Sequence, residues 1–111
     1  MKKFLIACNY YEFDVLVSNI ACVTDTLEEA NDLKEKFEEY KKKFLQYWAE
    51  YRNINNIRYF YTIQHNESFL SFLKEKDPTN IKYHNIFLNL FSKHFFVQSY
   101  FDVEEVEYIK Q

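Results

Sequence analysis

The feature that most constrains this fold is a long run of apolar residues at helical spacing. Steps of three and four residues carry the run through residues 27–51, and charged residues fall on the opposite side. This spacing is typical of an amphipathic helix with one buried face. Thr26 with Glu29 predicts a capping box at its start, and Asp25 with Glu28 offers an alternative register. The apolar stripe consists of Leu27, Ala30, Leu33, Phe37, Tyr40, Phe44, Trp48 and Tyr51.

The length of this helix bears on how the domain is built. We expect it to end near Asn53, where Asn55 and Asn56 take the place of the glycine that commonly follows a helix. Asn can do this because it tolerates the left-handed conformation. About 26 residues at about 1.5 Å each span roughly 39 Å. That length matches or exceeds the diameter expected for a compact chain of this size, so the helix should cross the whole domain, bend or protrude.

Segments rich in β-branched and aromatic residues predict strands on both sides of this helix. Residues 3–10 and 15–24 are expected to form a hairpin, with its turn between Tyr11 and Asp14. Residues 57–64 alternate and predict a third strand. Residues 96–109 are expected to return to the sheet as a fourth strand, although their acidic residues could instead cap a last helical turn.

Two further helices are predicted in the second half of the chain. The first runs from Asn66 or Ser68 to about Lys76, and the second covers residues 78–94, with Pro78 suited to the first helical position. The second helix is apolar around most of its circumference, as in a helix that is central in the core or covered by a partner. The sequence therefore predicts an α+β fold in a single domain of residues 1–111. Its sheet of three or four strands, with an N-terminal β-hairpin, packs against one long amphipathic helix and two C-terminal helices.

The chain of 111 residues contains no glycine. The phosphate-cradling loop, the dinucleotide fingerprint and the nucleophile elbow all need glycines for steric reasons, so none occurs here in standard form. His84 and His94 point in different directions on one predicted helix, and His65 with Glu67 is a weak candidate for a nonstandard site. We expect these histidines to face solvent or the edge of the core. The sequence therefore predicts no enzyme activity, no catalytic residue, no cofactor and no bound metal.

The cysteines and the first residues of the chain indicate a compartment. Cys8 and Cys22 lie in apolar strand-like segments without the spacing of a metal or redox site, so we expect buried free thiols in a reducing compartment. Lys2 and Lys3 superficially resemble the start of a lipoprotein signal. The four apolar residues before Cys8 are fewer than the roughly 7–15 that a signal needs, and no window approaches the ~18 apolar residues of a membrane span. A cytoplasmic protein without membrane contact is expected.

Aromatic residues make up 21% of the chain, and two compatible explanations apply. An AT-rich genome favours codons for Phe, Tyr, Ile, Asn and Lys, and the chain holds twelve Lys against two Arg, with ten Asn. An aromatic-rich contact surface is the functional explanation, since Tyr and Trp are enriched in interfaces. Three surfaces qualify: the hairpin tip, the far end of the long helix and the apolar circumference of the helix over residues 80–94. The candidate residues are Tyr10, Tyr11 and Phe13 at the tip, and Tyr47, Trp48 and Tyr51 at the helix end.

Each of these sets could instead pack in the core. A domain this small leaves much of its surface exposed, so we expect at least one set to contact a partner protein or a second copy in a homodimer. The sequence thus predicts a protein-binding module that acts sterically, as an inhibitor or adaptor, on a host or defence complex. Its short length, AT-rich composition and net charge of −3 are similar in general character to small phage and mobile-element proteins that block host machinery, anti-CRISPR and other anti-defence proteins included.

Two alternatives remain open at this point. A single-stranded nucleic-acid-binding protein needs aromatic residues interleaved with positive charge. Arg52 and Arg58 with residues 59–61 come closest, near the lysines at 41–43, although the acidic balance supplies no global basic field. A self-assembling structural protein is the other alternative.

Overall fold

The computed structural model describes residues 2–57, 66–91 and 99–107. Across these residues it contains a three-stranded antiparallel sheet and three α-helices, which confirms the α+β prediction. The strand predicted at 57–64 lies outside the described residues except for its first position, as do the last three residues of the helix predicted to reach 94. The elements in chain order are β1 (Lys2–Glu12), β2 (Val15–Thr24), α1 (Leu27–Ile54), α2 (Asn66–Lys76), the 3-10 helix η2 (Pro78–Asn80), α3 (Ile81–Phe91) and β3 (Tyr100–Glu107).

The chain divides into two compact units, which we describe separately. The sheet unit comprises Met1–Glu39 and Val97–Gln111, and the helical unit comprises Tyr40–Phe96. Helix α1 contributes its first part to the sheet unit and its second part to the helical unit. The single domain expected from the sequence stays a prediction, because a compact unit need not fold alone.

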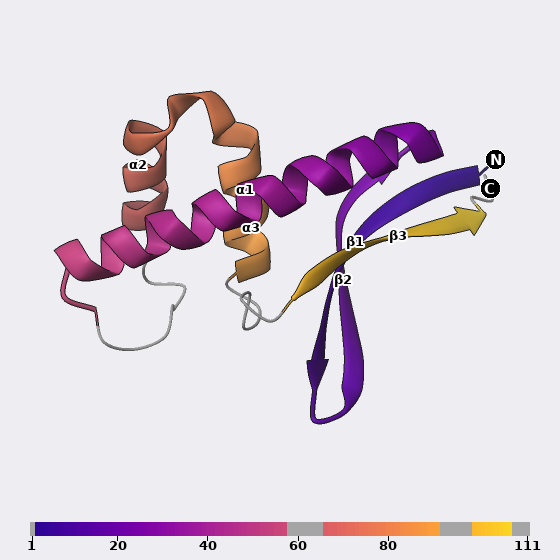
Figure 1. The fold of residues 1–111 in the computed structure, drawn as a ribbon, viewed down its shortest axis with the longest axis horizontal. Helices are drawn as coiled ribbons and strands as arrows, with labels where there is room; N and C mark the ends of the chain where they lie inside the picture. Colours follow the sequence, from indigo (N-terminus) through magenta and orange to yellow (C-terminus); the bar gives the residue numbers. More distant parts are fainter. Residues whose placement is uncertain (1, 58–65, 92–98, 108–111) are drawn as a thin grey trace. The chain divides into compact units, whose positions relative to one another are not determined.

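The sheet has the strand order β2-β1-β3, with both neighbouring pairs antiparallel (Figure 1). Strand β3 confirms the strand predicted in the C-terminal segment, and the alternative of a last helical turn is wrong for residues 100–107. The ladder between β1 and β3 runs from Lys2 paired with Glu107 to Asn9 paired with Tyr100. Among the described strands, the ladder with β3 ends at Asn9, and residues 10–12 of β1 continue the ladder with β2. The β1–β2 hairpin therefore extends past the end of β3, as Figure 1 shows.

One face of this sheet packs against the first part of α1. Ile6, Cys8 and Phe101 are buried on that face, each with 2% or less of its surface exposed. The ring of Phe37 in α1 lies 5.4 Å from the ring of Phe101, and a carboxylate oxygen of Glu38 accepts a hydrogen bond from the Phe101 amide over 3.3 Å. Because strand side chains alternate between faces, the other face of the sheet points away from α1.

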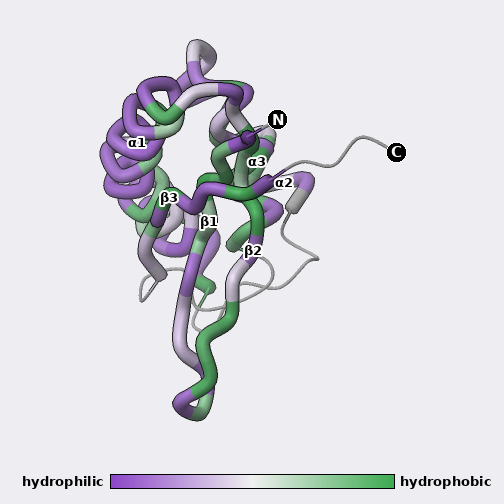
Figure 2. Tube along the Cα trace, turned by 90° about the vertical axis from the view of Figure 1, so that its right-hand side faces the viewer, coloured by the Kyte–Doolittle hydropathy of each residue, from purple (hydrophilic) through white to green (hydrophobic). Residues whose placement is uncertain are grey.

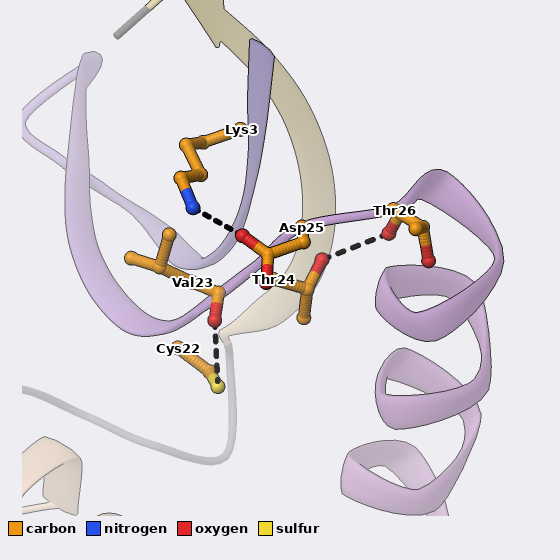
Figure 3. A network of polar contacts seen from close by, with 6 residues as sticks. All are labelled: Lys3, Cys22, Val23, Thr24, Asp25 and Thr26. Atoms are coloured by element: carbon orange, nitrogen blue, oxygen red, sulfur yellow. Dashed lines mark hydrogen bonds and ion pairs between the residues drawn. The ribbon is translucent and has the colours of Figure 1, made fainter. Parts of the chain in front are cut away.

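Polar contacts fix the start of α1 next to the strands. The Glu29 amide donates to Oγ1 of Thr26 over 3.2 Å, as predicted for one half of a capping box. The Thr24 hydroxyl donates to the Thr26 carbonyl over 2.9 Å, and Lys3 forms an ion pair with Asp25 (Figure 3). These contacts join the end of β2 to the beginning of the helix and connect both to β1.

The end of α1 shows how a chain without glycine stops a helix. Asn56 has a φ of 54°, in the left-handed region. The Ile57 amide donates to the Arg52 carbonyl over 2.9 Å, and the Asn56 amide donates to the Asn53 carbonyl over 3.4 Å. These two bonds are those of a Schellman motif, in which Asn56 occupies the position usually held by glycine. The predicted replacement of glycine by asparagine is confirmed at Asn56.

The helical unit is built around aromatic rings. Phe44 of α1 is fully buried, and α2 and α3 supply most of its neighbours. Tilted and edge-to-face arrangements of this kind are favoured by the ring quadrupoles. Ring centroids within 6.0 Å of Phe44 belong to Tyr40, Phe69, Phe87 and Phe91.

Candidate functional site

The tip of the β1–β2 hairpin is a two-residue turn made by Phe13 and Asp14. Both residues have positive φ, 50° and 64°, and they connect Glu12 to Val15, which pair across the ladder. Two consecutive left-handed residues make a type I′ turn, which Asn-Gly forms most readily. A side chain with a Cβ costs about 1–2 kcal/mol in this conformation. The turn is tighter than the Tyr11–Asp14 segment expected from the sequence. Phe13 carries that cost in full, whereas Asp14 carries less of it because Asp tolerates the left-handed conformation.

Phe13 is unusual in both conformation and exposure. Bulky residues are rare at positive φ, and the Phe13 side chain is 93% exposed. Burial therefore does not offset the backbone cost in the isolated chain. A residue held in a sparsely populated conformation is a reason to look for function at that place.

The sheet face that points away from α1 is exposed along β2. Ile20 is 63% exposed and Val23 is 52% exposed. Figure 2 shows β2 as a mostly hydrophobic strand leading to the hairpin tip. The ladder pairs on this face are Leu5 with Val23, Ala7 with Ile20, Asn9 with Ser18, and Tyr11 with Leu16. The pair of Asn9 and Ser18 is joined by a 2.5 Å hydrogen bond between the side chains, so polar contacts hold the ladder while apolar side chains remain in solvent.

We call the exposed apolar residues of the hairpin the hairpin surface. Each has at least 48% of its surface exposed. Leu16, Ile20 and Val23 share one face of β2, whereas Val15 pairs with Glu12 and lies beside the turn. Exposed apolar residues gathered on one element mark an interaction site more often than apolar residues scattered singly. No residue of β2 is charged, and the charges nearest the turn are the acidic Glu12 and Asp14. The members of the hairpin surface are Tyr11, Phe13, Val15, Leu16, Ile20 and Val23.

The structure brings together the three candidates predicted at the hairpin tip. Tyr11 and Phe13 belong to the hairpin surface, and Tyr10 is half-buried on the opposite face of the sheet. The four members contributed by β2 were not predicted from the sequence. Their apolar residues at both parities are typical of a strand buried on both faces. In a three-stranded sheet, one covering helix buries only one face of such a strand. Apolar residues on both faces of β2 were therefore the signal in the sequence that one of its faces is exposed.

The candidates at the far end of α1 are placed differently. Trp48 and Tyr51 are 8% and 7% exposed. The Trp48 ring lies 5.2 Å from Phe69 and 5.5 Å from Phe91, edge to face with both, and the Tyr51 hydroxyl is 2.5 Å from that of Ser68. These two residues stabilise the helical unit and are unavailable as a surface. Tyr47, which is half-buried, donates to the Asp77 carboxylate over 3.0 Å.

The remaining candidates were the arginines and the apolar circumference of the helix over residues 80–94. Arg52 is exposed, and its Nε donates to the Ile57 carbonyl over 3.3 Å, which supports the end of α1. Arg58 lies outside the described residues. Most of the apolar circumference of α3 is core, because Phe87, Leu88, Leu90 and Phe91 are buried.

His84 is fully buried, which corrects the expectation that it faces solvent or the core edge. Its Nδ1 is hydrogen bonded to the Tyr40 hydroxyl, and its Nε2 lies 2.7 Å from the Asp77 carbonyl oxygen. A carbonyl can only accept, so in the neutral ring Nε2 carries the proton and Nδ1 accepts from Tyr40. Burial, together with the charge of Asp77 and the nearby Tyr47, raises the pKa of Tyr40, which keeps its hydroxyl protonated as a donor.

Asp77 completes this network between α2 and η2. Burial alone would raise the pKa of its carboxyl group. Hydrogen bonds from Asn80 over 2.8 Å and from Thr79 and Tyr47 over 3.0 Å each outweigh that effect and lower the pKa. Every polar group named here has a partner within the network. These hydrogen bonds connect α1 to the segment that contains α2 and α3, and they have a structural role.

Comparisons with protein-family models, with curated proteins and with solved structures found no match. Within the described ranges, no group of three or more His, Cys, Asp or Glu side chains is arranged to hold a metal ion. Of the helices in those ranges, none is long and apolar enough to cross a membrane. The hairpin surface is therefore the strongest functional candidate in the described part of the chain.

Proposed function

We propose that this chain is a protein-binding module that covers a surface of a partner protein with its β1–β2 hairpin. The observation that carries the proposal is Phe13, which is 93% exposed at the tip of a strained type I′ turn. Both the exposure and the backbone conformation cost free energy in the isolated chain. Burial of this ring against a partner would recover the hydrophobic part of that cost. Aromatic anchors of this kind commonly dominate the energy of protein interfaces.

The charges around the hairpin favour a protein partner over nucleic acid. Strand β2 has no Lys or Arg, the turn is flanked by Glu12 and contains Asp14, and β3 carries four carboxylates. Single-stranded nucleic acid requires positive charge along its backbone path. The mode of action that we propose is steric, as in an inhibitor or adaptor, and an inhibitor of a host or defence complex is one case of it.

The test compares two variants that introduce the same charge at two exposed apolar positions. Phe13→Asp changes the tip, and Asp is among the residues that tolerate a left-handed turn. Leu27→Asp is the matched control, because Leu27 is 51% exposed at the start of α1 and an acidic residue is favourable at a helix N-terminus. Both variants should keep the far-UV circular dichroism spectrum of the natural chain.

Tagged natural chain and both variants are used to capture partners from a lysate of the cells in which the protein is made, with and without nuclease. The proposal expects a stoichiometric protein that survives nuclease, is retained by Leu27→Asp and is lost or reduced at least tenfold by Phe13→Asp. Equal capture by all three chains would refute the hairpin as the binding surface. A signal that disappears with nuclease would favour the nucleic-acid alternative.

A further inference from the structure

The two edges of the sheet differ sharply in charge. Strand β2 forms one edge and β3 forms the other. Across Val15–Thr24, β2 carries no charged residue and no proline. The eight residues of β3 include four carboxylates and no cation. The four acidic residues are Asp102, Glu104, Glu105 and Glu107.

Exposed sheet edges present unpaired backbone groups, and proteins guard them with charges, prolines or very short strands. The β3 edge follows this rule. A second β3 placed beside it would bring carboxylates against carboxylates, which is destabilising in a cross-strand pair. The β2 edge has a bulge at Ala21, which is a further device of this kind, but its segment from Val15 to Ile20 carries no charge and no proline. Among the described strands, β1 alone pairs with β2.

We infer that the outer edge of β2 pairs antiparallel with β2 of a second copy of this chain, across a twofold axis. The register between β1 and β2 defines which part of the β2 edge is regular enough to pair with a second copy. Between β1 and β2 it shifts at Ile6 and Ala7, which leaves Ala21 as an extra residue in β2. The segment between the turn and this bulge, residues 15–20, is the regular part of the edge. Alternate residues of an antiparallel strand direct their backbone groups outward, and these would bond to the second copy.

The charge contrast also selects a dimer over a polymer. Within the described strands each copy has one uncharged outer edge and one acidic outer edge, so pairing through β2 closes after two chains. A contact that uses the same patch on both subunits is the isologous type that gives closed dimers. No like charges meet in this pairing, because β2 is uncharged, whereas the net charge of −3 on each chain disfavours less specific association. The result is one sheet with the strand order β3-β1-β2-β2-β1-β3.

This inference goes beyond the proposed function and does not depend on it. Edge pairing joins backbones in the plane of the sheet, whereas the hairpin surface lies on the sheet face and at the tip. Tyr11 and Phe13 therefore remain free for a partner in the dimer. Leu16 and Ile20 of the two copies would become neighbours across the new strand pair.

The test places the same lysine at opposite edges of the sheet. Ile20 and Asp102 both pair with Ala7, one from each side, so they lie in the same row of the sheet and on the same face. Ile20→Lys introduces the charge that blocks edge pairing. Asp102→Lys, at an exposed position on the β3 edge, is the matched control. Light scattering and sedimentation equilibrium over a range of chain concentrations report the mass, and backbone amide exchange reports which β2 amides become protected.

We expect the natural chain and Asp102→Lys to reach twice the 13.7 kDa of one chain, and Ile20→Lys to stay at the mass of one chain with its circular dichroism unchanged. Alternate amides of residues 15–20 should be protected in the dimer and exchange at least tenfold faster in Ile20→Lys. A natural chain that is monomeric at all concentrations would overturn the inference, as would a dimer that Ile20→Lys does not weaken. Partner capture separates the two proposals, because Phe13→Asp should lose the partner while remaining dimeric.

Discussion

Replacing the turn residues Phe13 and Asp14 by Asn and Gly should make the chain more stable and its binding weaker. Both native residues have positive φ, which costs about 1–2 kcal/mol for a residue with a Cβ and less for Asn or Asp. Glycine removes the steric cost at the second position but loses about 0.5–1 kcal/mol through its greater freedom in the unfolded chain. Phe13 is 93% exposed, so its removal sacrifices almost no burial. The net expectation is a gain of about 1 kcal/mol.

Urea unfolding followed by far-UV circular dichroism measures this gain. With a slope of about 1–2 kcal/mol per M for a chain of this size, the midpoint should rise by about 0.5–1 M. Partner capture should fall at least tenfold, because the aromatic anchor is gone. A control variant, Asn56→Gly, relieves the same kind of conformation at the end of α1 and should raise stability slightly without changing capture. A midpoint that falls in the Asn-Gly variant would refute the reasoning, since Phe13 would then be a structural residue.

Three further predictions concern the helical unit. Phe44→Ala should lower the unfolding free energy by about 3–5 kcal/mol in urea unfolding, because Phe44 is fully buried among aromatic rings, whereas Ile54→Ala, at a position 72% exposed, should change it little. Tyr40→Phe should cost about 1–3 kcal/mol in the same assay, because the buried Nδ1 of His84 loses its donor; a neutral result would show that the pair is not formed. The lowered pKa of Asp77 stabilises the fold at pH values above the carboxyl pKa of the unfolded chain, about 3.9. That contribution should be lost as pH falls through the lower folded pKa, and thermal unfolding between pH 6 and 2 should show a shallower acid decline for Asp77→Asn.

The helices were predictable because local rules and tertiary packing agree in them. The apolar stripe from Ala30 onward, the Thr26 cap and the left-handed Asn56 appear in the structure as the sequence indicated, whereas Leu27, the first residue of the predicted stripe, is 51% exposed. Trp48 and Tyr51 are instructive because their spacing already placed them on the buried stripe. We predicted a surface role for them from the length of the helix, which allows its far end to protrude. In the structure, rings from α2 and α3 cover this part of the stripe.

The hairpin surface was harder to predict because strand faces depend on register. A shift of one residue exchanges the two faces of a strand, and the sequence left the turn anywhere between Tyr11 and Asp14. The bulge at Ala21 then shifts the alternation of faces by one residue within β2, so that Ile20 and Val23 lie on the same face. Because odd and even positions of β2 are both apolar, the sequence pattern could locate neither the turn nor the bulge. Only the pairing with β1 shows that Ile20 and Val23 share the face that α1 leaves open.

A biased genome does not by itself explain the apolar character of β2. AT-rich codons supply Lys and Asn as readily as Phe, Tyr and Ile, and the chain uses twelve Lys and ten Asn. Lys occupies solvent-exposed positions of α1, as at Lys42 and Lys43. Strand β2 has equally exposed positions, yet none of its ten residues is Lys, and Val or Leu occupies several of them. Exposed positions in this chain are therefore filled differently at the hairpin than on α1, which is the pattern expected if the hairpin is covered when the protein works.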